Sequence, residues 1–202
     1  MLGRAIARGL RALQVPVIDI SPDRTWDSKW HQDFILHLAS LFRPNVYVEV
    51  GIHHCGLFNR MIPYASRLIG VDANPDSAKY MKRCAKTEFV CATSSDYVRR
   101  LRQQPLLIDL LFIDADHSEA AVESDFKGVF NFVAPHGLIL LHDTHPLDER
   151  ATSQERCGDG YKAIARLSAR TEQYEMMTLP KHPGLTLCRK RTQQLSWQEQ
   201  GA

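Results

Sequence analysis

The sequence predicts an α/β protein with a doubly wound, mostly parallel β-sheet, and three observations carry this prediction. A β-branched run from Val46 to Val50 ends at a glycine, and a second short apolar run, LIGVD, ends at Asp72. Two further apolar runs, residues 106–117 and 137–146, lead into carboxylates and histidines. Helix-like segments separate these runs, so that each strand can return to the sheet in the same direction.

The first strand, turn, helix and second strand form a βαβ unit suited to a nucleotide-type ligand. In such a unit the ligand lies at the carboxyl ends of the strands, facing the N–H groups of the first loop and a helix N-terminus. Asp72 follows Gly51 by about 20 residues, the separation that lets the second carboxylate accept both ribose hydroxyls. The spacing GxGxxG of a pyrophosphate loop is missing, because four residues separate Gly51 from Gly56. A short loop that merely tolerates a glycine is the alternative.

The remaining segments supply helices and a terminal hairpin. Residues 26–42 and 121–133 repeat apolar side chains at helical spacing, and residues 160–170 form a third helix-like segment. Near the end, the segments 174–180 and 185–190 flank a turn rich in proline and glycine. This pattern predicts an antiparallel hairpin, which a nicotinamide-binding half-domain does not need.

The first loop also carries a family resemblance. Glu49, Gly51 and Gly56 resemble the first motif of class I S-adenosylmethionine-dependent methyltransferases, whose Rossmann-like sheet ends in an antiparallel hairpin. His53 and Cys55 stand where many members of that superfamily carry further glycines. The resemblance implies that the cofactor is S-adenosylmethionine.

Two later motifs narrow the resemblance to one group. The segments FIDADHSEAAVESDF and GLILLHDTHP are similar to methyltransferase family 24, whose relatives include metal-dependent O-methyltransferases and cephalosporin-hydroxylase-like proteins. The resemblance covers roughly residues 46–190. It implies a fold and a reaction class, and it leaves the substrate open.

The resemblance implies a set of cofactor-binding residues. An acidic residue two positions before the loop glycine helps to hold the amino-acid end of the cofactor, and the carboxylate after the second strand binds the ribose. The turn after the third strand, in the segment EFVCATSSDY (residues 88–97), borders the adenine. The end of the fourth strand, in the run 106–117, lies beside the cofactor. The residues at these positions are Glu49, Gly51, Gly56, Asp72, Thr93, Ser94 and Asp114.

The ends of the fourth and fifth strands predict a cluster of carboxylates. Asp114 ends the fourth strand and Asp143 the fifth, and adjacent strand ends in a parallel sheet meet at the same crevice. In metal-dependent relatives the acidic residues at these ends bind a divalent cation, and a neighbouring residue supplies another ligand. Here that neighbour is His142 or Thr144, and we favour His142 because cephalosporin-hydroxylase-like relatives have a ligand just before the second aspartate. The implied ligands are therefore Asp114, His142 and Asp143, for magnesium or manganese. A histidine ligand would shift the preference toward manganese, iron or zinc.

His117 is the candidate general base. It stands three positions after Asp114, where catechol and caffeoyl-CoA type O-methyltransferases carry the lysine that takes the acceptor proton. Histidine titrates near neutrality and can take that role with little adjustment of its pKa. The alternative is that His117 caps the following helix together with Ser118.

Composition places the chain among ordinary globular proteins. With 202 residues, 44% hydrophobic and 24% charged, it can bury a core without disulfides. A net charge of +2 and the lack of a basic cluster with interleaved aromatics argue against nucleic acid as a partner. The odd number of scattered cysteines, without CxxC spacing, indicates a reducing, cytoplasmic location. They are Cys55, Cys84, Cys91, Cys157 and Cys188.

We expect one methyltransferase domain over residues 1–202, with a helical segment at 1–45, the core at 46–190 and a polar tail at 191–202. The Arg-containing N-terminus is too short and too charged to span a membrane. It predicts a helix that packs on the domain or on a second subunit, with a membrane-surface or targeting helix as the alternative.

The combined patterns predict a methyltransferase that uses S-adenosylmethionine. We expect O-methylation of a small polar metabolite or sugar-like acceptor, assisted by a metal. A noncatalytic or cephalosporin-hydroxylase-like protein with the same cofactor site is the competing hypothesis, and a nicotinamide dehydrogenase comes third.

Overall fold

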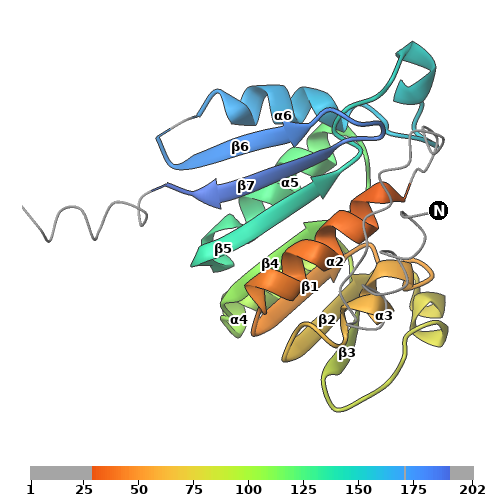
Figure 1. The fold of residues 1–202 in the computed structure, drawn as a ribbon, viewed down its shortest axis with the longest axis vertical. Helices are drawn as coiled ribbons and strands as arrows, with labels where there is room; N and C mark the ends of the chain where they lie inside the picture. Colours follow the sequence, from red (N-terminus) through yellow and green to blue (C-terminus); the bar gives the residue numbers. More distant parts are fainter. Residues whose placement is uncertain (1–28, 171, 192–202) are drawn as a thin grey trace, which may run out of the picture.

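Residues 29–170 and 172–191 of the computed structural model form a seven-stranded β-sheet with helices on both faces (Figure 1). The strands are β1 (Val46–Val50), β2 (Arg67–Asp72), β3 (Thr87–Cys91), β4 (Ile108–Ile113), β5 (Val133–His142), β6 (Tyr174–Leu179) and β7 (Leu185–Lys190). The α-helices are α2 (Trp30–Phe42), α3 (Gly56–Met61), α4 (Ser94–Gln103), α5 (Glu119–Val129) and α6 (Gly160–Ser168). Short 3₁₀ turns are η1 (Pro75–Lys79), η2 (Phe130–Phe132) and η3 (Glu149–Thr152).

The strand order is β3-β2-β1-β4-β5-β7-β6. Strands β1 to β5 run parallel, whereas β7 pairs antiparallel with both β5 and β6. The predicted doubly wound sheet with a C-terminal antiparallel hairpin is therefore confirmed. The order reverses between β1 and β4, and ligands of such sheets bind at the carboxyl ends of the strands beside that reversal.

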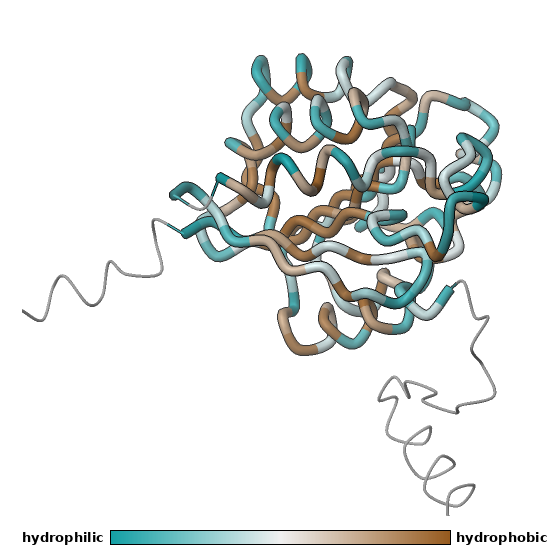
Figure 2. The backbone as a smooth tube through the Cα atoms, turned by 90° about the horizontal axis from the view of Figure 1, so that it is seen from above, coloured by the Kyte–Doolittle hydropathy of each residue, from teal (hydrophilic) through white to brown (hydrophobic). Residues whose placement is uncertain are grey.

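Alternating side chains divide the core between the two faces of the sheet. Val48 and Val50 pack in a cluster with the buried faces of α4, α5 and α6, whereas Tyr47 packs with α2 and α3 on the other side. The helices thus cover both faces, and the strands are hydrophobic on both sides as parallel strands require. Figure 2 shows hydrophobic strand segments in the middle of the molecule and hydrophilic segments toward its outside.

The start of β5 differs from the expected boundary. The helical spacing extended to Val133, with Pro135 and Gly137 after it, but α5 ends at Val129 and β5 already begins at Val133. The pairing of β4 with β5 shifts register in this stretch. Such a bulge accommodates Pro135, which has no N–H group to donate to a neighbouring strand.

Two sequence predictions lie outside the described residues. These are the Arg-containing helix near the N-terminus, with the homodimer expected through it, and the polar tail after residue 191. The predicted amphipathic helix at 26–42 is found as α2, from Trp30 onward. Among the described helices, none combines the length and the apolar character that crossing a membrane requires.

Candidate active site

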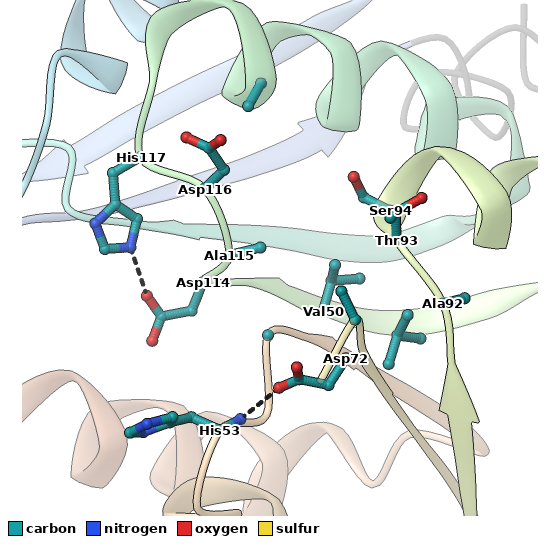
Figure 3. A pocket seen from close by; sticks show the side chains of 14 residues that line it. Val50, His53, Asp72, Ala92, Thr93, Ser94, Asp114, Ala115, Asp116 and His117 are labelled. Atoms are coloured by element: carbon teal, nitrogen blue, oxygen red, sulfur yellow. Dashed lines mark hydrogen bonds and ion pairs between the residues drawn. The ribbon is translucent and has the colours of Figure 1, made fainter. Parts of the chain in front are cut away.

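A cleft of about 730 Å³ opens at the carboxyl ends of the parallel strands (Figure 3). Its walls come from the ends of β1, β2, β3 and β4 and from the loops that follow them. A cleft of this size suits a small molecule or cofactor. The predicted site residues that line it are Gly51, Asp72, Thr93, Ser94, Asp114 and His117.

Gly51 is held between the strands on either side of β1. Its N–H donates to the carbonyl of Val71 at 2.8 Å, and the N–H of Asp114 donates to the carbonyl of Val50 at 2.9 Å. Gly51 has a φ of +90°, and a Cβ placed there would lie 2.0 Å from the carbonyl oxygen of Asp114. Only glycine fits both the left-handed backbone and this close approach.

The loop after Gly51 contains two further residues with left-handed backbone. His53 has a φ of 43° and Cys55 a φ of 56°. These are the two positions at which many class I methyltransferases have glycine. The left-handed backbone conformation at both positions explains why glycine is favoured there. A non-glycine residue in this conformation is strained. Cys55 is buried, which raises the pKa of its thiol to about 11 and indicates a packing role.

Asp72 is oriented by backbone donors at the mouth of the cleft. One carboxylate oxygen accepts from the N–H of His53 at 2.8 Å, and the other accepts from the N–H of Asn74 at 2.8 Å. Each oxygen has a second lone pair for a further donor. The loop after β1 and the end of β2 are thereby tied together, and the carboxylate retains its capacity for ligand hydroxyls.

Thr93 and Ser94 lie where α4 begins, on the cleft wall. The hydroxyl oxygen of Thr93 accepts from the N–H of Asp96 at 3.1 Å, so Thr93 is the N-cap of the helix. Thr93 therefore has a structural role besides its place in the cleft.

Glu49 and Gly56 are not among the residues that line the cleft. Glu49 is buried, with its carboxylate accepting from the hydroxyl of Tyr47 at 2.6 Å. Burial raises the pKa of Glu49 to about 8 against the effect of this hydrogen bond. Gly56 is the first residue of α3, and a Cβ there would meet only the side chain of Gln32, at 3.8 Å.

Four side chains at the ends of β4 and β5 form a closed ring of contacts. His142 Nδ1 lies 2.9 Å from Asp114 Oδ1 and 3.2 Å from Asp143 Oδ2. On the other side, His117 Nε2 lies 3.1 Å from Asp143 Oδ2 and 3.5 Å from Asp114 Oδ1. The structure therefore brings together all the residues that the sequence analysis predicted for the metal and the base.

The ring couples the charges of its members. Burial would raise the pKa of Asp114, but His142 and His117 outweigh it and hold that pKa far below its usual range. The hydrogen bond to Asp114, helped by Asp143, raises the pKa of His117 to about 9. Burial disfavours the charge of His142, yet the two carboxylates raise its pKa to about 10. Two carboxylates and two imidazoles thus stabilise each other's charges.

His117 is held by the loop between β5 and α6. Its Nδ1–H donates to the carbonyl of Arg156 at 2.6 Å, which directs Nε2 toward the carboxylates. Gly160 N–H donates to the carbonyl of His117 at 2.8 Å. Ser118 is the N-cap of α5, because its hydroxyl accepts from the N–H of Ala121 at 3.3 Å. The side chain of His117 takes no part in this cap. Two hydrogen bonds therefore connect His117 to the segment between β5 and α6 and to the start of α6.

One residue beside the ring was missed by the sequence analysis. His31 of α2 is 4% exposed, and its ring centroid lies 3.8 Å from that of His142. The available signal was its place in the helix, because His31, Ile35 and Ala39 would share one face at a spacing of four residues. Nothing in the local pattern tells that this face reaches the ends of β4 and β5.

The fold and the site together define a class of enzyme. The strand order, the terminal hairpin and a cleft bounded by Gly51 and Asp72 are those of a class I S-adenosylmethionine-dependent methyltransferase. The sequence also matches the family described as "Methyltransferase domain" over residues 37–144, more than half of the chain. The chain therefore belongs to this family of methyltransferases. No curated protein sequence matches the chain significantly.

Solved structures share the fold at low sequence identity. An O-methyltransferase from Bacillus cereus in complex with S-adenosylhomocysteine has 16% identity and a TM-score of 0.63, covering 93% of this chain and 90% of its own. A methyltransferase of Podospora anserina bound to S-adenosylhomocysteine has 14% identity and a TM-score of 0.64, with coverages of 85% and 83%. The O-methyltransferase TomG from Streptomyces achromogenes, in complex with S-adenosylmethionine, has 15% identity and a TM-score of 0.65, with coverages of 91% and 86%.

Proposed function

We propose that the protein transfers the methyl group of S-adenosylmethionine to a hydroxyl oxygen of a small polar or sugar-like acceptor. The observation that carries this proposal is that the cofactor-sized cleft and the ring of two aspartates and two histidines share Asp114 and His117. A methyl donor in the cleft would lie beside groups that can bind and deprotonate an alcohol. Two of the similar structures are of O-methyltransferases, which supports the choice of oxygen as the acceptor atom.

We assign to the cleft residues the cofactor roles expected from the sequence. We assign the ribose hydroxyls to Asp72, whose carboxylate is already oriented by two backbone donors. Gly51 would admit the amino-acid half of the cofactor, and Thr93 and Ser94 would border the adenine. Glu49 is buried, does not line the cleft, and has a raised pKa that keeps its carboxyl neutral near pH 7. We therefore propose that it supports the end of β1 next to Gly51, through its hydrogen bond from Tyr47, instead of binding the amino-acid end by its charge.

A divalent cation fits the donors of the ring. In an octahedral site with bonds of about 2.1 Å, neighbouring ligand atoms lie about 3 Å apart. The contacts of His142 Nδ1 with Asp114 and Asp143, at 2.9 and 3.2 Å, match that separation. We therefore keep Asp114, His142 and Asp143 as the proposed metal ligands. A bound cation would lower the pKa of an acceptor hydroxyl and fix its position.

His117 is the proposed base for the acceptor proton. The carboxylates that raise the pKa of His117 are the proposed metal ligands, so a bound cation would offset their charge and favour the neutral ring. Because Nδ1–H donates to Arg156, that neutral ring would carry its lone pair on Nε2, on the side of the carboxylates and the cleft. During transfer, the acceptor O–H proton would pass to Nε2 while the oxygen–methyl bond forms. The sulfur–methyl bond breaks at the same time, and its electron pair stays on sulfur to give S-adenosylhomocysteine.

We also propose that the chain forms a single methyltransferase domain and acts in the cytoplasm. In support of this location, all five cysteines are free thiols, as expected in a reducing compartment.

Isothermal titration calorimetry with S-adenosylhomocysteine tests the cofactor assignment. Wild type should bind, and Asp72→Ala should bind at least about tenfold more weakly, because the ribose loses a charge-assisted acceptor. Asp76→Ala is the matched control, since Asp76 is a nearby exposed carboxylate outside the cleft. Equal affinity of wild type and Asp72→Ala would remove Asp72 from the ribose site.

A thermal-shift comparison separates the competing classes. S-adenosylhomocysteine at about 100 times its dissociation constant should stabilise the protein by about 2.7 kcal/mol, whereas NAD should not. Transfer of a labelled methyl group to a panel of polyols, sugars and phenols then tests the reaction itself. Stabilisation by NAD alone would contradict the proposed function.

A further inference from the structure

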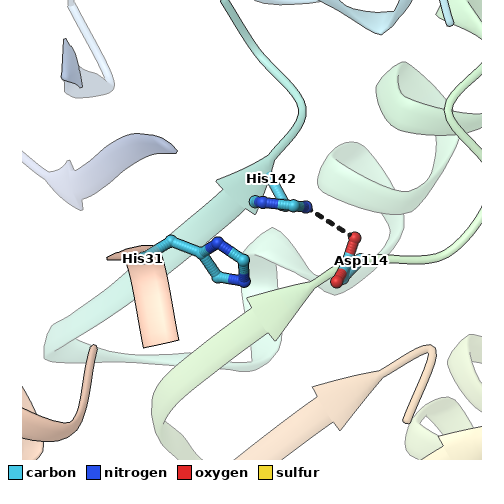
Figure 4. Close-up of side chains that lie close together, drawn as sticks. All are labelled: His31, Asp114 and His142. Carbon is cyan, nitrogen blue, oxygen red and sulfur yellow. Dashed lines mark hydrogen bonds and ion pairs between the residues drawn. The ribbon is translucent and has the colours of Figure 1, made fainter. Parts of the chain in front are cut away.

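His31 brings a third imidazole to the ring from a different layer of the fold (Figure 4). One donor atom each from His31, Asp114 and His142 can be chosen so that all three lie within 4.8 Å of one another. These side chains come from α2, from the loop after β4 and from the end of β5, respectively. Helix α2 therefore contributes to the same cluster as the two strand ends.

The position of His31 follows from the packing of α2. Ile35 and Ala39 follow His31 on the inner face of the helix, and all three are buried. The first turn is also held in place, because Trp30 Nε1–H donates to the carbonyl of His182 at 2.9 Å. The inner face of α2, which packs on the sheet, therefore carries His31 at its N-terminal end, next to Asp114.

The neighbouring imidazoles of His31 and His142, tilted by 46° to each other, lie beside an aromatic side chain. Phe112 packs against both rings, with centroids 6.0 Å from His31 and 6.1 Å from His142. The Nε2 atom of His142 is buried and has no hydrogen-bond partner among the described residues. A buried polar nitrogen is costly unless it is bonded, so an apolar side chain would pack here at lower cost. An imidazole at position 142 therefore has a cost in packing, as expected of a residue kept for its chemistry.

We propose that His31 is a metal ligand supplied by helix α2, and that the resulting site selects a divalent transition metal such as manganese, iron, cobalt or zinc over magnesium. This inference rests on the cation site proposed above at Asp114, His142 and Asp143, and adds a ligand and a selectivity to it. Magnesium prefers oxygen donors, whereas imidazole nitrogen favours the transition metals. With His31, the proposed donor set becomes two imidazoles and two carboxylates, and the second imidazole nitrogen favours a transition metal over magnesium.

Metal titration of the full chain tests this inference without any methyl acceptor. Manganese(II) and magnesium(II) binding would be measured for wild type, His31→Gln and His37→Gln by calorimetry and by electron paramagnetic resonance of free manganese. His37 is the matched control, because it lies on the same helix and outside the cluster. We expect wild type and His37→Gln to prefer manganese, and His31→Gln to bind manganese at least ~10-fold more weakly.

A second variant covers the case in which His31→Gln does not fold. In His31→Cys loaded with cobalt(II), a thiolate-to-metal charge-transfer band absent from wild type should appear, because the new thiol would reach the metal. Manganese binding that is equally tight in wild type and folded His31→Gln would overturn the inference. So would the lack of the band in folded His31→Cys, or a wild type that binds no transition metal.

The cofactor experiment separates this failure from that of the proposed function. If wild type binds S-adenosylhomocysteine and manganese affinity does not depend on His31, the inference fails and the methyltransferase proposal stands. If manganese binding depends on His31 while no S-adenosyl cofactor binds, the inference stands and the proposed function fails.

Discussion

Gly51 and Asp114 approach each other so closely that no side chain fits between them. A Cβ on Gly51 would lie 2.0 Å from the carbonyl oxygen of Asp114, and the φ of Gly51 is +90°. The loop after β1 and the loop that carries Asp114 can therefore pack this closely only because residue 51 has no Cβ.

Gly51→Ala should accordingly destabilise the fold by several kcal/mol, since it combines a backbone clash with left-handed strain. Gly56→Ala should change stability by less than about 1 kcal/mol, because its Cβ meets only Gln32 at 3.8 Å. Urea unfolding of both variants measures the difference. Equal stability of the two variants would contradict the packing described for Gly51.

The strain at His53 predicts an asymmetry between two adjacent histidines. His53 has a φ of 43°, whereas His54 is not in the left-handed region. His53→Gly and His54→Gly both loosen the unfolded chain, but only the first relieves left-handed strain. His53→Gly should therefore be more stable than His54→Gly by about 1 kcal/mol in urea unfolding. The reverse order would show that the loop stores no strain at His53.

Glu49 predicts a pH-dependent difference in stability. Its pKa of about 8 in the folded protein lies above the usual 4.5, so the folded state keeps a proton that the unfolded chain releases. The contribution of Glu49 is therefore present below pH 4.5, declines as the pH rises, and is lost above about 8. Glu49→Gln should remove this decline, gaining on the order of a few kcal/mol relative to wild type between about pH 5 and about pH 9.

Unfolding at both pH values, with Glu88→Gln as the control, measures this effect. Hydrogen bonding to Arg67 lowers the pKa of Glu88, so its substitution should cost the same at both pH values. A difference between Glu49→Gln and wild type that does not change with pH would show that Glu49 ionises as freely in the folded protein as in the unfolded chain.

His117→Ala should lower turnover by ~10²–10⁴ and leave the affinity for S-adenosylhomocysteine within about twofold of wild type. Proton removal belongs to the transfer step, and binding of the donor does not require it. His136→Ala, on the exposed start of β5, is the control. The measurement needs an acceptor from the labelled-methyl panel. A folded His117→Ala enzyme with wild-type turnover would exclude His117 as the base.

Much of this site was accessible from the sequence because strand ends are a local feature. Asp72, Asp114 and Asp143 each follow a short apolar run, and parallel strands place such residues at one edge of the sheet. The hairpin at the C-terminus was likewise visible from its turn residues. Cofactor and metal binding by these residues stay predictions, and the experiments described above are their tests.

The sequence by itself determined which carboxylates and histidines follow each strand, and to which family the chain belongs. Only the tertiary structure decided that His31 lies against His142, that Arg156 orients His117, and that Glu49 is buried outside the lining of the cleft. The physical reason is the separation along the sequence between the residues that interact. Strand and turn patterns depend on neighbouring residues, whereas these contacts depend on how α2 and the loop before α6 pack against the sheet, and no local pattern encodes that packing.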